Sequence, residues 1–359
     1  IKAMNEEYIR DINNLTESVI EKLKEFKAFG NQENTKKSKR IPTQASSDFL
    51  IHKEQGDYAE RVVFEDLNKE ASDYAALRYG RNDDISAGDQ GFKDFYRAYQ
   101  EELESIGKKP DLLIIPKVHM RIADLDISAM SGRSQKYYLE KAIAGLEVRS
   151  SSYSYEEHES YVEEILKENK TKLERKYLEL RKLISKDSQS SAFDDIRDFG
   201  SDIDLPKASK SDSKQIRELR KDYKQLQTEI GKTKKSLNFT VKVEDIISIK
   251  RWIDNYGVRH FFVQVMYDRI FMISFGRVLQ IVSDEDDYEI AKDSRNQFKS
   301  TIKIPLARGY QIGIISELPE LKVENKLLQG GRVIYPIRFR NGKAEVNTST
   351  VAEIINSDL

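Results

Sequence analysis

The sequence contains no cysteine and only four histidines among its 359 residues. Without cysteine the chain has no thiol nucleophile, no disulfide and no cysteine-bound zinc, which fits a reducing cytoplasm. The histidines are scattered without the spacing of zinc ligands, which disfavours a histidine metal site and a Ser-His-Asp triad. They are His52, His119, His158 and His260.

Long apolar runs and an excess of one charge are also absent. No run approaches the roughly 18 apolar residues of a membrane span, and the first residues lack a signal-peptide pattern. The 60 basic and 61 acidic residues give a formal net charge of -1. This balance argues against a uniformly basic coat but allows one basic cleft. The phosphate-binding pattern Gly-x-x-x-x-Gly-Lys-Ser/Thr is missing too, which disfavours an ATP-driven translocase.

Two short apolar segments each carry an acidic residue, and both lie in the interval 110–152. Asp111 precedes the apolar run 112–115, and Glu147 lies within the segment 145–151. Apolar runs of this length, bounded by Gly or Pro, predict buried strands. Two carboxylates on neighbouring strands of a buried sheet are costly unless a cation compensates them.

A divalent metal is the usual compensation, and hard oxygen ligands suit Mg²⁺. The sequence therefore predicts one or two Mg²⁺ ions in the site. We expect the carboxylates of Asp111 and Glu147 and the backbone carbonyl of Val148 to be the ligands. Carboxylates that hold Mg²⁺ beside a cation are suited to phosphodiester hydrolysis.

The basic residue that follows Glu147 along the predicted strand is Arg149. Strand side chains alternate, so Arg149 should share a face with Glu147 and could hold a phosphate oxygen. An arginine does not deprotonate, which excludes it as a general base. The attacking water must then be activated by the metal, by the substrate phosphate or by another lysine. Lys117 is the nearest lysine in sequence to the Asp111 strand.

The remaining sequence predicts helices and strands around this pair. Residues 47–70 should form a helix capped by Ser47 or Asp48. Residues 260–267 and 270–275 should form a hairpin that joins the central sheet, and 300–306 and 332–339 a peripheral sheet. Further helices are expected at 5–28, 92–106, 136–143 and 243–256, and a further strand at 74–79.

Composition divides the chain into three parts. Residues 1–45 hold a helix and a polar, basic linker at 30–42, which is either a solvated loop or a phosphate-contacting arm. Residues 46–154 and 238–359 form the core. Residues 155–237 form a charged pair of helices that is either a solvated insertion or an arm that dimerises or wraps DNA.

The pattern Pro-Asp, spacer, Glu-x-basic resembles that of the PD-(D/E)XK nucleases, with Arg149 where lysine is usual. Four stretches together resemble the AccI-like type II restriction endonucleases, over most of residues 45–275. They are Lys53-Glu54-Gln55-Gly56-Asp57-Tyr58-Ala59-Glu60, Gly88-Asp89-Gln90-Gly91-Phe92, Ile106-Gly107-Lys108-Lys109-Pro110-Asp111-Leu112-Leu113-Ile114 and Gly145-Leu146-Glu147-Val148-Arg149-Ser150-Ser151. The hairpin at 260–275 is similar as well.

The resemblance implies an α/β (α+β) protein with a restriction-endonuclease-like central mixed β-sheet, flanked by helices and carrying a long charged helical insertion. It implies Mg²⁺-dependent cleavage of both strands of double-stranded DNA at a short palindrome, by a cytoplasmic bacterial homodimer paired with a DNA methyltransferase. Asp111 and Glu147 carry over as catalytic residues, with Arg149 in the basic position. Glu60 carries over as a third acid on the preceding helix, although an exposed helical glutamate is an equal alternative.

Two other functions stay open. One is a non-catalytic DNA-binding or scaffolding protein in which the acids are structural. The other is a repair nuclease that prefers DNA ends or branches. Arg, Lys and Gln side chains are the usual readers of bases, although phosphate contact is the commoner role. By position, the candidates for DNA binding are Lys117, Arg133, Gln135, Lys136 and the basic residues of 295–311.

Overall fold

The structure is a computed structural model of the chain, and its fold divides into two compact units. One unit comprises Ile1–Ser154 and Asn238–Leu359, and the other comprises Tyr155–Leu237. The residues that the structure describes are 2–25, 46–69, 73–80, 85, 87–121, 125–130, 132–184, 213–232, 236–285, 287–292, 300–327, 331 and 333–357. The predicted basic linker at 30–42 lies outside the described residues.

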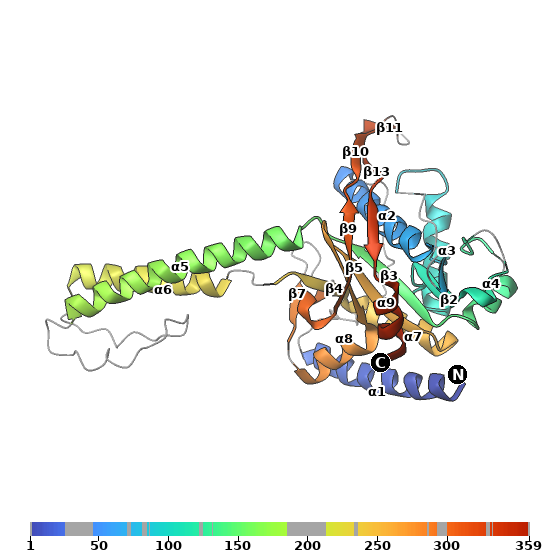
Figure 1. Cartoon of the computed structure of the whole chain (residues 1–359), viewed down its shortest axis with the longest axis horizontal. Coiled ribbons are helices and arrows are strands. Elements are labelled where there is room, and N and C mark those ends of the chain that lie inside the picture. The colour runs from blue at the N-terminus through green and yellow to red at the C-terminus, as the bar shows by residue number, and fades with distance from the viewer. Residues whose placement is uncertain are drawn as a thin grey trace. The chain divides into compact units, whose positions relative to one another are not determined.

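A seven-stranded mixed sheet forms the centre of the first unit (Figure 1). Its strands lie in the order β1-β2-β3-β5-β6-β9-β14, and every neighbouring pair is antiparallel except β3 and β5. Parallel neighbours need a long crossover, and the chain between β3 and β5 includes the whole second unit. The strands are β1 Tyr74–Arg78, β2 Leu112–Pro116, β3 Ala144–Ser150, β5 Arg259–Val265, β6 Arg269–Ser274, β9 Tyr310–Glu317 and β14 Lys343–Val346.

The sequence predicted β1, β2, β3 and the β5–β6 hairpin, and all of them are confirmed in one sheet. Strands at 300–305, 333–334 and 337–340 lie in smaller sheets outside the central one, as predicted for 300–306 and 332–339. The sequence analysis did not predict β9 and β14, which join the central sheet. Gly313 in β9 is one reason why the sequence gives little sign of these two strands. A Cβ there would lie 3.1 Å from the Cα of Val346, so the close approach of β9 and β14 depends on a residue that weakens strand patterns.

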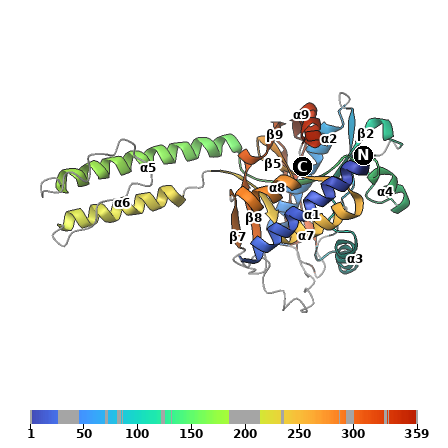
Figure 2. The same ribbon diagram turned by 90° about the horizontal axis from the view of Figure 1, so that it is seen from below.

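Helices cover both faces of the central sheet. Figure 2 shows α2 and α9 on one face and α1 and α7 on the other. Buried side chains of α2 and α9, including Val62 and Ile354, form one apolar cluster with residues of the sheet such as Val263. The helices of this unit are α1 Lys2–Glu25, α2 Ser47–Leu67, α3 Phe92–Ser105, α4 Gly132–Leu139, α7 Val243–Tyr256, α8 Phe275–Gln280 and α9 Thr348–Ser357.

The cap of α2 and the first residue of α4 differ from prediction. The N-cap of α2 is Ser46, whose Oγ accepts a hydrogen bond from the backbone N of Phe49 at 3.1 Å, and not Ser47 or Asp48. Three successive residues could act as caps, and the tertiary fold decides between them. Helix α4 begins at Gly132, four residues before the predicted start.

Smaller elements complete the first unit. A three-stranded sheet has the order β4-β8-β7, and two short ribbons pair β10 with β13 and β11 with β12. These strands are β4 Asn238–Lys242, β7 Glu289–Lys292, β8 Ser300–Pro305, β10 Glu320–Val323, β11 Lys326–Leu327, β12 Val333–Ile334 and β13 Ile337–Arg340. Single helical turns occur at Lys117–His119, Ile281–Glu285 and Leu306–Arg308.

The second unit contains the predicted pair of helices, α5 Tyr155–Ile184 and α6 Lys214–Lys232. They lie side by side over an apolar cluster that includes Leu173, Leu180 and Leu219 (Figure 1). The Lys176 amine also pairs with the Asp222 carboxylate across the two helices at 2.7 Å. The charged composition of the segment therefore belongs to the outer faces of a small helical hairpin.

Gly107 connects α3 to the segment that leads into β2, and we predict that it tolerates no side chain. Its φ is +88°, and a Cβ would lie 2.6 Å from the backbone N of Trp252 in α7. We expect Gly107→Ala to lower the free energy of unfolding by about 2–4 kcal/mol, from the left-handed backbone and the overlap.

Urea denaturation checks this prediction, with Gly56→Ala as the control. Nothing lies within 4 Å of a Cβ at Gly56, which is inside α2, so alanine should stabilise the protein by about 1 kcal/mol. Equal effects of the two substitutions would contradict the packing of Gly107 against α7.

Candidate active site

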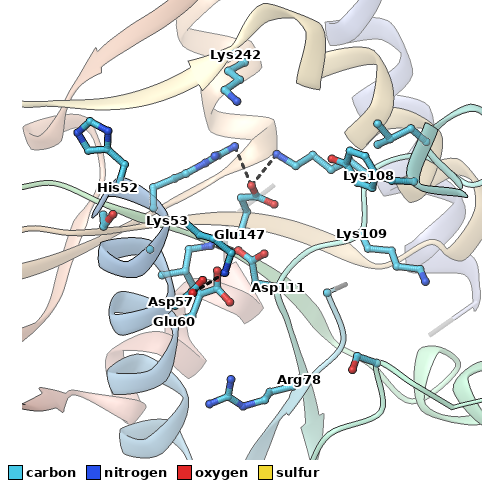
Figure 3. A pocket seen from close by; sticks show the side chains of 18 of the residues that line it. His52, Lys53, Asp57, Glu60, Arg78, Lys108, Lys109, Asp111, Glu147 and Lys242 are labelled. Carbon is cyan, nitrogen blue, oxygen red and sulfur yellow. Dashed lines mark hydrogen bonds and ion pairs between the residues drawn. The ribbon is translucent and has the colours of Figure 1, made fainter. Parts of the chain in front are cut away.

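The register of β2 and β3 brings Asp111 and Glu147 together. Leu112 pairs with Leu146, so the residue before Leu112 and the residue after Leu146 lie opposite each other. The Oδ2 atom of Asp111 accepts a hydrogen bond from the backbone N of Val148 at 2.7 Å. Both carboxylates line one cavity, and Figure 3 shows the Glu147 carboxylate turned toward Lys108. The predicted pairing of the two acids is therefore present.

Helix α2 adds a third carboxylate to the same cavity. Glu60 lies one turn beyond Asp57 on α2, and both side chains point toward Asp111 in Figure 3. The Asp57 carboxylate is paired with the Lys53 amine at 2.6 Å, whereas Glu60 accepts no hydrogen bond from the described residues. Of the two alternatives for Glu60, the structure places it in the cavity and not on an exposed helix face.

Two cations neutralise Glu147. The Lys108 Nζ lies 2.7 Å from the Oε1 of Glu147, and a guanidinium nitrogen of Arg149 lies 2.8 Å from the same atom. Both cations also contact the Oδ2 of Asp245 in the first turn of α7, at 2.7 Å from Lys108 and 3.0 Å from Arg149. Arg149 shares a face of β3 with Glu147, as predicted from strand alternation.

These contacts give the three acids different pKa values. Burial raises the pKa of Asp111 well above its usual range, and the negative charges of Glu147 and Glu60 add to the effect. Burial also raises the pKa of Glu60, to about 7, with Asp57 and Glu147 contributing. Burial opposes ionisation of Glu147 as well, but Lys108 and Arg149 outweigh it and lower the pKa of Glu147 to about 2.

The cavity has a volume of about 720 Å³ and presents charges of both signs. One wall carries the carboxylates, and the surrounding cations suit a polyanionic substrate. Burial, together with the charges of Arg149 and Lys108, lowers the pKa of Lys242, although Asp245 opposes this. The cations that line the cavity are Lys53, Arg78, Lys108, Lys109, Arg149 and Lys242.

The donor atoms at the base of the cavity fit Mg²⁺. The Oε2 of Glu147 is buried and has no hydrogen-bond partner among the described residues. The N–H of Val148 points at Asp111, and the N–H and C=O of one strand residue face the same side, so the carbonyl of Val148 faces this edge too. Among the described residues no group of three or more acidic or histidine side chains forms a complete metal site. Mg²⁺ does not need one, because it keeps several waters and uses one or two carboxylates plus substrate phosphates.

Comparison with known protein families identifies the family of this chain. A family model described as AccI restriction endonuclease matches residues 6–359. The chain belongs to the AccI restriction endonuclease family. Membership makes it a DNA endonuclease, a hydrolase whose substrate is DNA. No curated protein and no solved structure matches the chain. None of the described helices has the length and apolar character of a membrane span.

Of the residues predicted to contact DNA in this restriction endonuclease, Arg295 and Lys299 lie outside the described residues. The described ones lie outside the cavity: Lys117, Arg133, Gln135, Lys136, Lys303 and Arg308. Arg133 and Lys136 are exposed on α4. Gln135 is buried, and its amide nitrogen donates to the carbonyl oxygens of Ile127 at 2.8 Å and Ser128 at 3.2 Å. A bidentate contact of Gln135 with adenine would break at least one of these bonds, because both amide hydrogens are already used.

Lys117 does not reach the carboxylates either. Its Nζ donates to the backbone carbonyl of Lys69 at 3.4 Å. The lysine that contacts Glu147 is Lys108, and sequence reasoning missed both it and Asp245. Lys108 had one available signal, its place three residues before Asp111. The signal for Asp245 was weaker. It is an acid in the first turn of α7, next to the buried residues Val243 and Ile246 but not itself one of the buried residues of this helix.

We predict that Glu60 makes the stability of the metal-free protein depend on pH. Its pKa is about 7 in the folded protein and near 4.5 when unfolded, so the folded state holds the proton more tightly. This stabilisation is complete below pH 4.5 and is lost as the pH rises through 7. The variant Glu60→Gln should therefore be more stable than the wild type at pH 8.5, by on the order of 1–3 kcal/mol, and not at pH 4.5.

Thermal unfolding in EDTA at the two pH values measures this difference. Glu65→Gln is the matched control, because Glu65 lies on the same helix but is exposed and paired with Arg61 at 3.4 Å. If Glu60→Gln and the wild type showed the same difference at both pH values, Glu60 would not carry the raised pKa.

Proposed function

We propose that this family member is a type II restriction endonuclease, which hydrolyses phosphodiester bonds of double-stranded DNA at a short palindrome with Mg²⁺. The observation that carries the proposal is the pairing of Asp111 and Glu147 at the base of a cation-lined cavity. The unpartnered Oε2 of Glu147 leaves one buried oxygen available to a metal. The central mixed sheet flanked by helices supports a restriction-endonuclease-like core of the PD-(D/E)XK type.

Asp111, Glu147 and the carbonyl of Val148 would hold the metal, as one or two Mg²⁺ ions. The chemistry that Mg²⁺ would supply at these residues is polarisation of the phosphate, activation of water and stabilisation of the leaving oxygen. Glu60 adds a third carboxylate beside the pair, with a pKa of about 7 that a nearby dication would lower. Arg149 stays charged, keeps Glu147 ionised and can hold a phosphate oxygen.

The cations around the carboxylates position DNA. Lys109 and Lys242 line the same cavity as the acids, and the phosphate backbone supplies the negative charge that they attract. Arg133 and Lys136 on α4 are exposed and suit further phosphate contacts. They carry no information about which bases are read.

A homodimer follows from the proposed palindrome. Each subunit would contribute one pair of metal-binding carboxylates, Asp111 and Glu147. A two-fold axis would then place one pair at each strand of a symmetric DNA site. A partner methyltransferase of the same system would protect the host's own sites. Analytical ultracentrifugation should give a mass of twice the 41.6 kDa of one chain. A monomer both in the absence and in the presence of DNA would contradict the dimer.

The two other functions make different predictions. A DNA-binding scaffold would retain DNA in a gel without cutting it in Mg²⁺ or Mn²⁺. A repair nuclease would prefer ends or branched DNA and would give no discrete fragments from a plasmid. The paired acids favour cleavage over scaffolding, because a scaffold gains nothing from two carboxylates that are costly to bury.

We predict that Asp111→Asn and Glu147→Gln each lower plasmid cleavage by on the order of 10³-fold or more, because each removes a metal-binding charge and keeps the side-chain shape. The wild type should give discrete fragments in Mg²⁺ and none in EDTA. Mapping the cut ends on a plasmid of known sequence identifies the site.

Asp254→Asn is the control for these variants. Asp254 lies on α7 outside the cavity and pairs with Lys250 at 2.6 Å, so its loss should leave cleavage unchanged. Wild-type cleavage by the Asp111→Asn variant would overturn the assignment of the active site.

A further inference from the structure

Lys108 lies in the active site but outside the predicted strands, so the alternation of strand side chains does not predict its position. The position two residues after Glu147 carries Arg149, whose guanidinium is a planar and permanently charged group. The Lys108 amine lies 2.7 Å from the Oε1 of Glu147, yet it belongs to the segment before β2. The site thus contains a lysine amine that the segment before β2 supplies.

Two anchors hold this lysine in place. The backbone N of Lys108 donates to the carbonyl of Ser248 in α7 at 2.9 Å, directly after the tightly packed Gly107. At the other end of the side chain, the Oδ2 of Asp245 accepts a hydrogen bond from the Lys108 amine at 2.7 Å. Helix α7 therefore fixes both the backbone and the amine of Lys108.

The amine keeps one donor for a substrate. A lysine ammonium has three N–H donors, and the described residues use two of them, through Glu147 and Asp245. The Lys108 side chain is mostly buried but lines the cavity that holds the carboxylates. Its third donor is available to an oxygen that enters this cavity, either a phosphate oxygen or the attacking water.

The other lysines that line the cavity pair with different acids or make no contact with Glu147. Lys53 pairs with Asp57 at 2.6 Å, and Lys109 pairs with Glu102 at 3.1 Å. Lys242 lines the cavity but makes no ion pair with Glu147 or Asp245. Among the described lysines, Lys108 is the one in contact with the carboxylate that is proposed to hold the metal.

We propose that Lys108 is a catalytic residue of this endonuclease, whose ammonium donates its third hydrogen bond to an oxygen of the scissile phosphate or to the attacking water. Asp245 is its positioning residue. The inference rests on the proposed function, because it requires that Asp111 and Glu147 form the cleavage site. Lys108 acts as a fixed cation and hydrogen-bond donor, and no proton transfer by Lys108 is involved.

Single-turnover cleavage of a DNA duplex carrying the mapped site tests the proposal. Lys108→Ala should lower the rate in Mg²⁺ by about 10²–10³-fold, the usual loss for one preorganised donor. Its affinity for the same duplex in Ca²⁺ should fall far less. Ethylammonium added to Lys108→Ala should restore part of the rate, because a free amine can enter the space left by the side chain.

Three further variants separate catalysis from structure. Asp245→Asn should lower the rate by about 10–100-fold, since the amine of Lys108 stays but is less well oriented. Arg149→Lys keeps the charge beside Glu147 and should lose less than Lys108→Ala. Lys250→Ala removes another lysine that pairs with an acid on α7 and should cleave like the wild type.

The outcomes distinguish the inference from the function on which it rests. If Asp111→Asn is inactive but Lys108→Ala cleaves at the wild-type rate, the role of Lys108 is overturned and the nuclease assignment stands. Loss of rate without rescue by ethylammonium, together with a matching loss of thermal stability, would show that Lys108 is structural and would also overturn its role. A wild type that cuts no DNA in Mg²⁺ or Mn²⁺ would overturn both.

Discussion

The site depends on one constraint, which is the burial of carboxylates where the neighbouring strands β2 and β3 bring Asp111 and Glu147 together. Ionised groups in such a place need compensating charge. Lys108 and Arg149 supply two positive charges, and Glu147 and Asp245 supply two negative ones, so the formal charges of this group cancel. Asp111 and Glu60, the next acids in the cavity, are left without a comparable partner, and the pKa of each is raised. We propose that a divalent cation supplies the compensation that these two acids lack.

The rest of the first unit keeps the acids in this position. The β2–β3 register sets Asp111 opposite Glu147, and β5 supports β3 from the other side through a parallel pairing. Helix α2 brings Glu60, and helix α7 brings Asp245 and holds the segment of Lys108. These charged groups therefore come from segments far apart in the sequence, and they meet only because the sheet and both its helical layers are formed.

Much of this arrangement could be predicted from local patterns, and the limits have physical causes. Asp111 and Glu147 were predictable, because an acid inside a short apolar strand has no structural reason to be there. The hairpin of β5 and β6 was predictable from two apolar runs with a short turn. Lys108 and Asp245 were not, because their contacts are tertiary and a charged residue in a charged sequence carries no periodic signal.

The same distinction explains where the structure differs from the sequence analysis. Gln135 was proposed as a base reader from its type and position, but its burial against the Ile127 turn depends on how α4 packs. The C-terminal strands β9 and β14 were not predicted, since Gly313 interrupts the strand pattern at the point where their backbones approach. In each case a packing contact decided the outcome, and the local pattern could not report it.

The most direct test of the metal site is anomalous diffraction from crystals of the protein with DNA and Mn²⁺. The account predicts a peak in contact with the carboxylates of Asp111 and Glu147 and the carbonyl of Val148, with Lys108 still on the other oxygen of Glu147. A Mn²⁺ ion bound elsewhere, with Asp111 and Glu147 contacting only protein groups while DNA occupies the cavity, would contradict it.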